Sequence, residues 1–257
     1  RRRQRQMCIR DRMNYYALTD IGKVRNKNQD QATVIANVKD QVIAIVCDGM
    51  GGHRAGEIAS RVVMDQFVNC FDSIPPFDNV DELKKWVNET IYEADAIVKR
   101  MAKQNVEHHG MGTTIVVAIL MDNVIYISHV GDSRAYVLKN DQLMQLTKDH
   151  TLVNALVDRG AISEEEAVNH SQKNVLTQAI GADTELTPSF IELEFADSLL
   201  LLCSDGLYNC LNDEIIKEIL KKNIKVSQKV TELIDRANEN GGRDNIGVAI
   251  IDNREEK

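Results

Sequence analysis

Five aspartates in this sequence stand at the ends of apolar runs. Asp48, Asp132 and Asp205 each come directly behind such a run or one residue after it, and Asp30 and Asp244 stand just before one. If the runs are neighbouring strands, the carboxylates meet, and like charges at short range destabilise a fold unless a cation lies among them. With oxygen ligands and no Cys–His cluster at zinc spacing, the pattern favours Mg²⁺ or Mn²⁺. A single Asp-Gly pair is equally typical of a turn after a strand.

Other residues near these acids could bind an anion. Gly49 and Gly206 each follow an aspartate, and we expect them to permit a sharp backbone exit and a carbonyl close to the ion. The loop GMGGHRAGE could cradle phosphate at a helix N-terminus, although it matches neither the Walker pattern nor GxGxxG. His53 in this loop is a candidate general acid or a solvated bystander. Arg25 lies in the same early loop as Asp30, so its expected partner is phosphate, and a surface ion pair is the alternative.

The elements that must position these residues alternate between strands and helices. Apolar runs predict three early strands, and helical spacing predicts a helix over 57–71 and a second one capped by Asn79 with Glu82. Four short strands between 113 and 146, joined by tight turns, indicate an antiparallel meander. Segment 149–187 contains little that could build a core and is expected to be a mobile insert. The pattern ends with strands at 188–203, helices around 212–222 and 227–239, and a last strand.

Composition and charge exclude several classes of protein. The chain has 257 residues with 43% hydrophobic and 27% charged side chains, which fits one large globular domain. The net charge is −8, and because residues 1–12 carry +5, the body over 13–257 carries −13 and should repel nucleic acid. We expect residues 1–12 to be an artefactual leader, with a nucleic-acid-binding arm as the alternative. No apolar run is long enough to span a membrane. Five cysteines without a CxxC pair favour a reducing, cytoplasmic setting.

Seven motifs in order carry a family resemblance: TDIGKVRNKNQD, VCDGMGGHRAGEIAS, GTT, HVGDSRAY, LTKDHT, LLLCSDGLYN and GGRDNIGVAII. Together they resemble the metal-dependent Ser/Thr protein phosphatases of the 2C type, in their bacterial stand-alone branch, from about Tyr15 to Ile251. The resemblance implies an α+β fold, an α/β/β/α sandwich of two mostly antiparallel sheets flanked by helices. It also implies a single catalytic domain over 13–257, in which 149–187 is a small flap beside the metal site that affects substrate choice.

The resemblance assigns roles to individual residues. Asp48 resembles the carboxylate that bridges two metal ions, with the Gly49 carbonyl completing one of them. Asp205 and Asp244 resemble ligands of the second ion, and Asp132 resembles the ligand of a third, weaker ion that it shares with Asp205. The remaining assignments are Arg25 as the phosphate-binding arginine, His53 as the less secure general acid, and Asp30 as a further acid of the metal site.

Two departures from the family pattern are Gln29, where many members have Glu, and Gln178, where an Arg is common. The implied activity is hydrolysis of phosphoserine and phosphothreonine in proteins by a hydroxide that bridges two Mn²⁺ or Mg²⁺ ions. Expected partners are phosphorylated proteins, including a cognate Ser/Thr kinase, with the enzyme a monomer. Two rivals remain: a catalytically dead binding module, disfavoured because Asp48, Asp205 and Asp244 are all present, and a metal-dependent phosphodiesterase.

Overall fold

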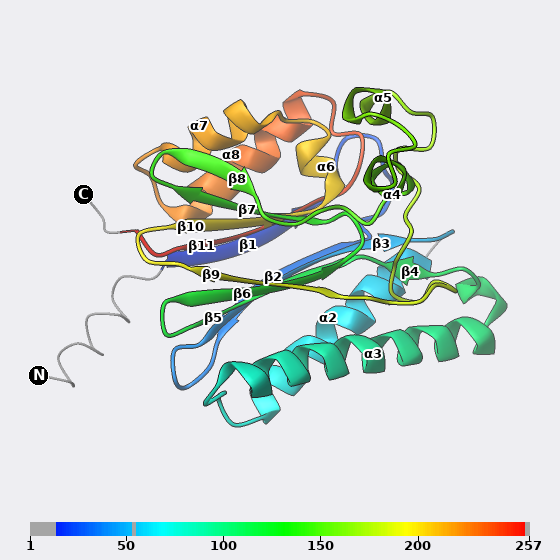
Figure 1. Ribbon diagram of the computed structural model, residues 1–257, viewed down its shortest axis with the longest axis horizontal. Helices are drawn as coiled ribbons and strands as arrows, with labels where there is room; N and C mark the ends of the chain where they lie inside the picture. Colours follow the sequence, from blue (N-terminus) through cyan, green and yellow to red (C-terminus); the bar gives the residue numbers. More distant parts are fainter. Residues whose placement is uncertain (1–13, 53–54, 255–257) are drawn as a thin grey trace, which may run out of the picture.

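The computed structural model describes residues 14–52 and 55–254 and forms a four-layer α/β/β/α sandwich (Figure 1). All strand pairs within the two sheets are antiparallel. The first sheet has the order β1 (Asn14–Asp20), β11 (Ile246–Asp252), β10 (Leu199–Cys203), β7 (Arg134–Lys139) and β8 (Gln142–Gln145). The second has the order β2 (Asp30–Ala36), β3 (Val42–Met50), β5 (Ile115–Met121), β6 (Val124–Val130) and β9 (Ser189–Glu194), with β4 (Gly112–Thr113) paired to β3.

Helices cover the outer face of each sheet (Figure 1). The second sheet is covered by α2 (Ala55–Ser73) and α3 (Val80–Gln104), and the first by α7 (Asp213–Lys221) and α8 (Val226–Glu239). The shorter elements are η1 (Val106–His108), α4 (Leu152–Asp158), α5 (Glu164–Val168) and α6 (Asp205–Tyr208). This arrangement confirms the fold class predicted from the sequence.

Strand β3 shows how the sequence builds the layers. Its side chains alternate between two separate cores because successive residues of a strand point to opposite faces. Ile43, Ile45 and Cys47 pack against the helices, whereas Val42, Ala44 and Val46 pack between the sheets. Both faces of β3 are therefore buried, which explains its nearly continuous apolar sequence.

The predicted start of α3 is confirmed. The Asn79 side chain accepts a hydrogen bond from the backbone N–H of Glu82 at 3.0 Å, which satisfies one of the free donors at the helix end. From there, Leu83, Val87 and Ile91 recur at helical spacing and are buried in the core beneath the second sheet.

Two expectations about strands were wrong. Strand β3 does not stop before Asp48 but continues to Met50, because Gly49 and Met50 pair with β4. The four strands between 113 and 146 are not one meander. The hairpin of β5 and β6 belongs to the second sheet and the hairpin of β7 and β8 to the first, so the chain changes sheets around Asp132.

The segment 149–187, for which we keep the name flap, holds the short helices α4 and α5. Thr151 caps α4, and Ser163 with Glu166 forms a capping box at α5. The end of the segment differs from the expectation, because Ile180 exchanges backbone hydrogen bonds of 2.9 and 3.0 Å with Thr113 and is fully buried. The last part of the flap is thus built into the sandwich.

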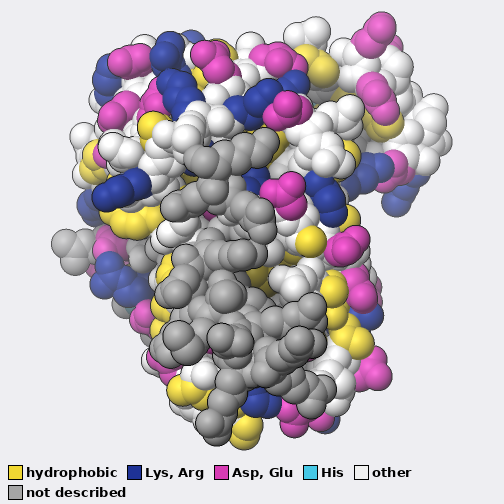
Figure 2. Space-filling model, turned by 90° about the vertical axis from the view of Figure 1, so that its left-hand side faces the viewer, with side chains coloured by type: hydrophobic (Ala, Val, Ile, Leu, Met, Phe, Trp, Pro, Cys, Tyr) yellow, Lys and Arg dark blue, Asp and Glu magenta, His cyan; other side chains and the backbone are white. Residues whose placement is uncertain are grey.

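The leader, residues 1–12, lies outside the described residues. No helix in the described part of the chain combines the length and the apolar character that crossing a membrane requires. On the face shown in Figure 2, acidic and basic side chains are interspersed over the described surface.

Candidate metal centre

The five aspartates come from both sheets and lie at one end of the sandwich. Asp30 opens β2 and stands opposite Asp48 in the register of β2 and β3. Asp205 begins α6 directly after β10, and Asp244 precedes β11, the strand that pairs with β10. Asp132 follows β6 at the point where the chain changes sheets. Strand pairing therefore brings acids that are far apart in the sequence into one region.

Burial and mutual repulsion both act on these carboxyls. Burial raises the pKa of Asp48 well above its usual value, and repulsion from Asp30, Asp205, Asp132 and Asp244 raises it further. The pKa of Asp30 rises to about 7, first through burial and then through Asp205 and Asp244, while the hydrogen bond from Ser204 lowers it.

Asp205 and Asp132 are affected in the same way. Burial, followed by repulsion from Asp244, raises the pKa of Asp205 to about 6. For Asp132, burial and then the charges of Asp205 and Asp149 raise the pKa to about 7. A divalent cation bound among these buried and half-buried carboxyls would offset their mutual repulsion and favour their ionised form. A donor set made only of oxygens suits Mg²⁺ or Mn²⁺. The chemistry of these residues fits the predicted metal.

Hydrogen bonds hold the carboxylates in place. The Ser204 hydroxyl donates to Asp30 Oδ2 at 2.6 Å and accepts from the Gly247 N–H at 2.7 Å, so it joins β10, β11 and β2. Asn209 Nδ2 donates to Asp205 Oδ2 at 3.1 Å. Ser204 and Asn209 are site residues that sequence reasoning missed, although both lie in the quoted motif LLLCSDGLYN.

Arg25 has a partner that the sequence did not suggest. Its Nη2 lies 2.6 Å from Asp244 Oδ2, and the Arg25 and Asp244 side chains are 54% and 36% exposed. Asp244 Oδ1 also accepts the Asn245 N–H at 2.9 Å. The ion pair is the alternative that the sequence left open for Arg25, and its partner, Asp244, is 219 residues away in the sequence. Arg25 does lie at the acidic site, as predicted.

Among the described residues, no three His, Cys, Asp or Glu side chains are gathered closely enough to hold an ion as they stand. Three of the carboxylates already accept hydrogen bonds: Asp244 from Arg25, Asp30 from Ser204 and Asp205 from Asn209. For an ion to bind Asp244 through Oδ2, this carboxylate must release Arg25.

The glycines beside the aspartates serve close packing rather than a sharp turn. A Cβ on Gly49 would lie 2.2 Å from the Gly56 carbonyl oxygen, and one on Gly206 would lie 1.9 Å from the Asn245 carbonyl oxygen. Gly49 lies within β3 and Gly206 within α6, and neither has a positive φ. Only residues without a side chain allow β3 to meet α2 and α6 to meet the start of β11 this closely.

Asn245 holds the Arg25 loop against the start of β11. Its side chain accepts from the Gln29 N–H at 2.8 Å and donates to the carbonyls of Ile21 and Lys27, both at 2.9 Å. This residue was also missed, although it lies in the motif GGRDN. Gln29 therefore contributes to the site through its backbone.

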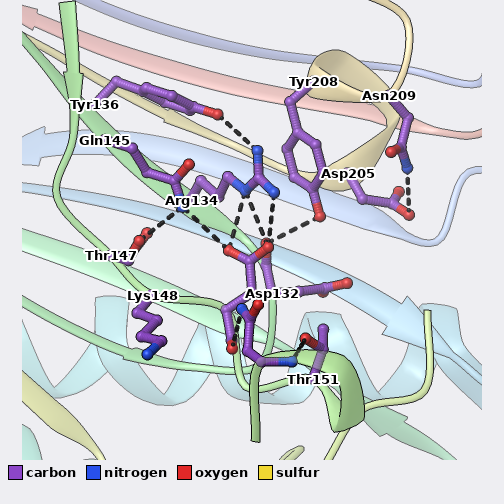
Figure 3. Close-up of polar contacts among 12 residues, drawn as sticks. Asp132, Arg134, Tyr136, Gln145, Thr147, Lys148, Thr151, Asp205, Tyr208 and Asn209 are labelled. Carbon is purple, nitrogen blue, oxygen red and sulfur yellow. Dashed lines mark hydrogen bonds and ion pairs between the residues drawn. The ribbon is translucent and has the colours of Figure 1, made fainter. Parts of the chain in front are cut away.

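Two further positions singled out in the sequence are His53 and Gln178. His53 lies outside the described residues. Gln178 accepts hydrogen bonds from the N–H and hydroxyl of Thr187, at 2.7 and 3.1 Å, so it fixes the end of the flap. Figure 3 shows a second polar network beside the acids: Arg134 binds Asp149 through two nitrogens, and Tyr208 donates to the Asp132 carbonyl at 3.1 Å.

A sandwich of two sheets with acids at one end defines a class of protein. Comparison with known sequences identifies that class. The family model for protein phosphatase 2C matches residues 15–156, and the chain belongs to this family. It is accordingly a protein serine/threonine phosphatase, an enzyme class in which metal-dependent dephosphorylation is general. The family and activity predicted from the sequence are confirmed.

Individual relatives resemble the chain over nearly its whole length. A serine/threonine phosphatase, stp, of Listeria innocua is 40% identical over 235 residues, which is 91% of this chain and 93% of that protein. The S. agalactiae serine/threonine phosphatase structure has a TM-score of 0.87 at 36% identity and covers 93% of this chain and 98% of its own. The PstP catalytic domain in complex with two manganese ions has a TM-score of 0.79 at 33% identity, covering 93% and 97%.

Proposed function

We propose that this chain hydrolyses phosphoserine and phosphothreonine in proteins at the cluster of five aspartates. The observation that carries the proposal is that buried and half-buried acids from both sheets converge at one end of the sandwich with an arginine at their edge. Such a site suits a dianionic phosphoryl group only when cations accompany it. A binding module without activity would not need to keep these buried, mutually repelling carboxyls.

The ligand roles are those that the family resemblance implies. Asp48, whose carboxyl is repelled by all four other acids, would be a ligand of both core ions, and the Gly49 carbonyl would be a further ligand. Asp205 and Asp244, on neighbouring segments, would hold the second ion. Asp132 lies near Asp205 and would share a third, weaker ion with it. When bound, Mn²⁺ or Mg²⁺ lowers the pKa of a water molecule and neutralises charge on the phosphoryl group.

The chain's own residues then position substrate and protons. The Arg25 guanidinium offers two parallel donors to phosphate oxygens, and to reach them it gives up the Asp244 carboxylate. Asp30 stays anchored by Ser204 behind Asp48, where it fixes the strand ends. His53 is the proposed donor of a proton to the leaving hydroxyl.

The proposal extends to the cellular setting. A cognate Ser/Thr kinase and its targets are the expected source of the phosphorylated substrates. The four cysteines in the described part of the chain are free thiols, two of them buried, which fits the reducing cytoplasm. The enzyme is expected to act as a monomer.

The proposal is tested by comparing two phosphate esters in the presence of Mn²⁺. A phosphothreonine peptide should be hydrolysed and bis(p-nitrophenyl) phosphate should not, and Asp48→Asn should abolish turnover while the circular dichroism spectrum stays native. Faster hydrolysis of the diester would make the enzyme a phosphodiesterase. Full turnover of the peptide by Asp48→Asn would remove the bridging role.

A further inference from the structure

A cavity of about 410 Å³ opens beside the metal centre. Its walls come from the flap and from the segments around Asp132 and Tyr208, and Asn209, at one end, donates to Asp205 Oδ2 at 3.1 Å. The cavity is therefore continuous with the site where the proposed function places the phosphoryl group. Side chains one to three residues from the phosphorylated residue lie within about 10 Å of it and can reach this space.

Asp132, a proposed metal ligand, lines the cavity, and beside it the charged residues Arg134 and Asp149 are paired with each other (Figure 3). Arg134 binds Asp149 at 2.7 and 3.0 Å and donates to the Tyr136 hydroxyl at 3.0 Å. Its guanidinium carbon also lies 3.7 Å from the centre of the Tyr208 ring. Arg134 and Asp149 thus satisfy each other, and neither is free to select a charged ligand.

Three further charged residues of the lining, Lys148, Lys173 and Glu164, do not favour a ligand of one charge either. Lys148 is paired with Asp158 on α4. Lys173 and Glu164, both exposed, are opposite in sign.

Among polar neighbours such as Thr151, Asn154 and Asn174, the flap contributes four aliphatic side chains to the cavity lining. Val153 and Val157 lie four residues apart on one face of α4, and Ala167 and Val168 face them from α5. Val168 is 66% exposed, although Val153 is buried. None of these four side chains belongs to the three apolar cores of the described fold. They form an apolar surface that is not packed into the cores of the sandwich.

We propose that this cavity receives an apolar side chain of the substrate protein, located within three residues of the phosphorylated residue. The inference rests on the proposed function, since the cavity matters only if the phosphoryl group binds at the aspartates. The occupant is aliphatic or aromatic because Arg134, Asp149 and Lys148 are already paired, whereas the four Val and Ala side chains of the flap have no apolar partner in the cores of the described fold. Burying such an occupant against these four side chains removes apolar area from water.

The test scans phosphothreonine peptides in which Leu replaces Ser at each of three positions on either side of the phosphorylated residue. With Mn²⁺ and the full chain, Leu at one position should raise kcat/KM about tenfold over the all-Ser peptide. Asp and Lys at that position should give no such gain. p-Nitrophenyl phosphate, which has no flanking residues, serves as the reference substrate.

Two cavity variants and one control locate the effect. Val168→Asp and Val157→Asp should bring the ratio of kcat/KM for the Leu and Ser peptides close to one. Val38→Asp makes the same change at a residue 92% exposed, beyond the end of β2 opposite to Asp30, and should keep the tenfold ratio. Because Val168 is exposed, its substitution should not impair folding, which a thermal melt checks.

The outcomes separate the inference from the proposed function. No Leu preference at any position, an equal gain with a charged residue, or a preference that survives both cavity variants would overturn the cavity assignment while phosphatase activity stands. If the wild-type chain with Mn²⁺ hydrolyses neither the peptides nor p-nitrophenyl phosphate, the proposed function fails first, and the cavity assignment falls with it.

Discussion

Replacing Arg25 by Ala should move catalysis and metal affinity in opposite directions. In the structure, Arg25 Nη2 binds Asp244 Oδ2 at 2.6 Å, so the arginine occupies a carboxylate that the metal requires. During turnover the same guanidinium should bind phosphate. The substitution therefore removes a substrate contact and frees a metal ligand.

The two magnitudes follow from the nature of each contact. Loss of a charge-assisted hydrogen bond to phosphate costs about 1.4–2.7 kcal/mol, which lowers kcat/KM about 10–100-fold. The Arg25–Asp244 pair is half exposed, at 54% and 36%, and is worth at most about 1 kcal/mol. Freeing Asp244 should thus tighten Mn²⁺ binding by about fivefold or less.

Steady-state kinetics on a phosphothreonine peptide at saturating Mn²⁺, with calorimetric Mn²⁺ titration of the metal-free protein, measures both quantities. We expect the catalytic loss to appear mainly in KM, with a smaller fall in kcat. Arg25→Lys is the matched variant, and it should recover only part of kcat/KM because an ammonium cannot bind two oxygens in parallel. Wild-type kcat/KM in Arg25→Ala would reduce Arg25 to a surface ion pair. Weaker Mn²⁺ binding would mean that Arg25 supports the metal ligands rather than competing for one.

Three further predictions concern the acids and their supports. Asp132→Ala should lower kcat but leave two Mn²⁺ bound by calorimetry, and loss of all metal binding would contradict the division into a core pair and a third ion. The pKa values of Asp30, about 7, and Asp205, about 6, lie above the usual value of about 3.9, so the metal-free fold binds extra protons. Their contribution to stability is lost as pH rises from about 4 to 7, so the Tm of the metal-free wild type should fall over this range. Asp205→Asn should show a smaller fall in Tm over the same pH range, and an equal fall would refute the prediction. Gly206→Ala should lower the free energy of unfolding by about 1–3 kcal/mol in a thermal melt, because its Cβ would lie 1.9 Å from a backbone oxygen. A Cβ at Gly52 would have nothing within 4 Å, so Gly52→Ala should melt like the wild type.

The sequence predicted features that depend on local pattern. The run around Val42 and Cys47 is a strand because its residues fill two cores, and Asn79 with Glu82 begins α3 because a side-chain oxygen three residues upstream satisfies a free N–H. The acids were found because each stands at the end of such a run. These signals lie within a few residues of the position they determine.

What could not be predicted depends on residues distant in the sequence. The Arg25 partner lies 219 residues away, and Ser204 reaches Asp30 across 174 residues. The role of Gly206 becomes visible only when the backbone of Asn245 is placed against it. Likewise, the change of sheet near Asp132 depends on how two hairpins pack, and the individual hairpin sequences do not encode it.

The most direct test of the account is the metal dependence of phosphate release from a phosphothreonine peptide. Half-buried carboxyls that repel one another, such as Asp48 and Asp205, are expected to need a divalent cation to act together. The full chain treated with EDTA should release no phosphate above the buffer rate, Mn²⁺ should restore release, and Asp205→Asn should need more Mn²⁺. Undiminished release in EDTA would contradict the account.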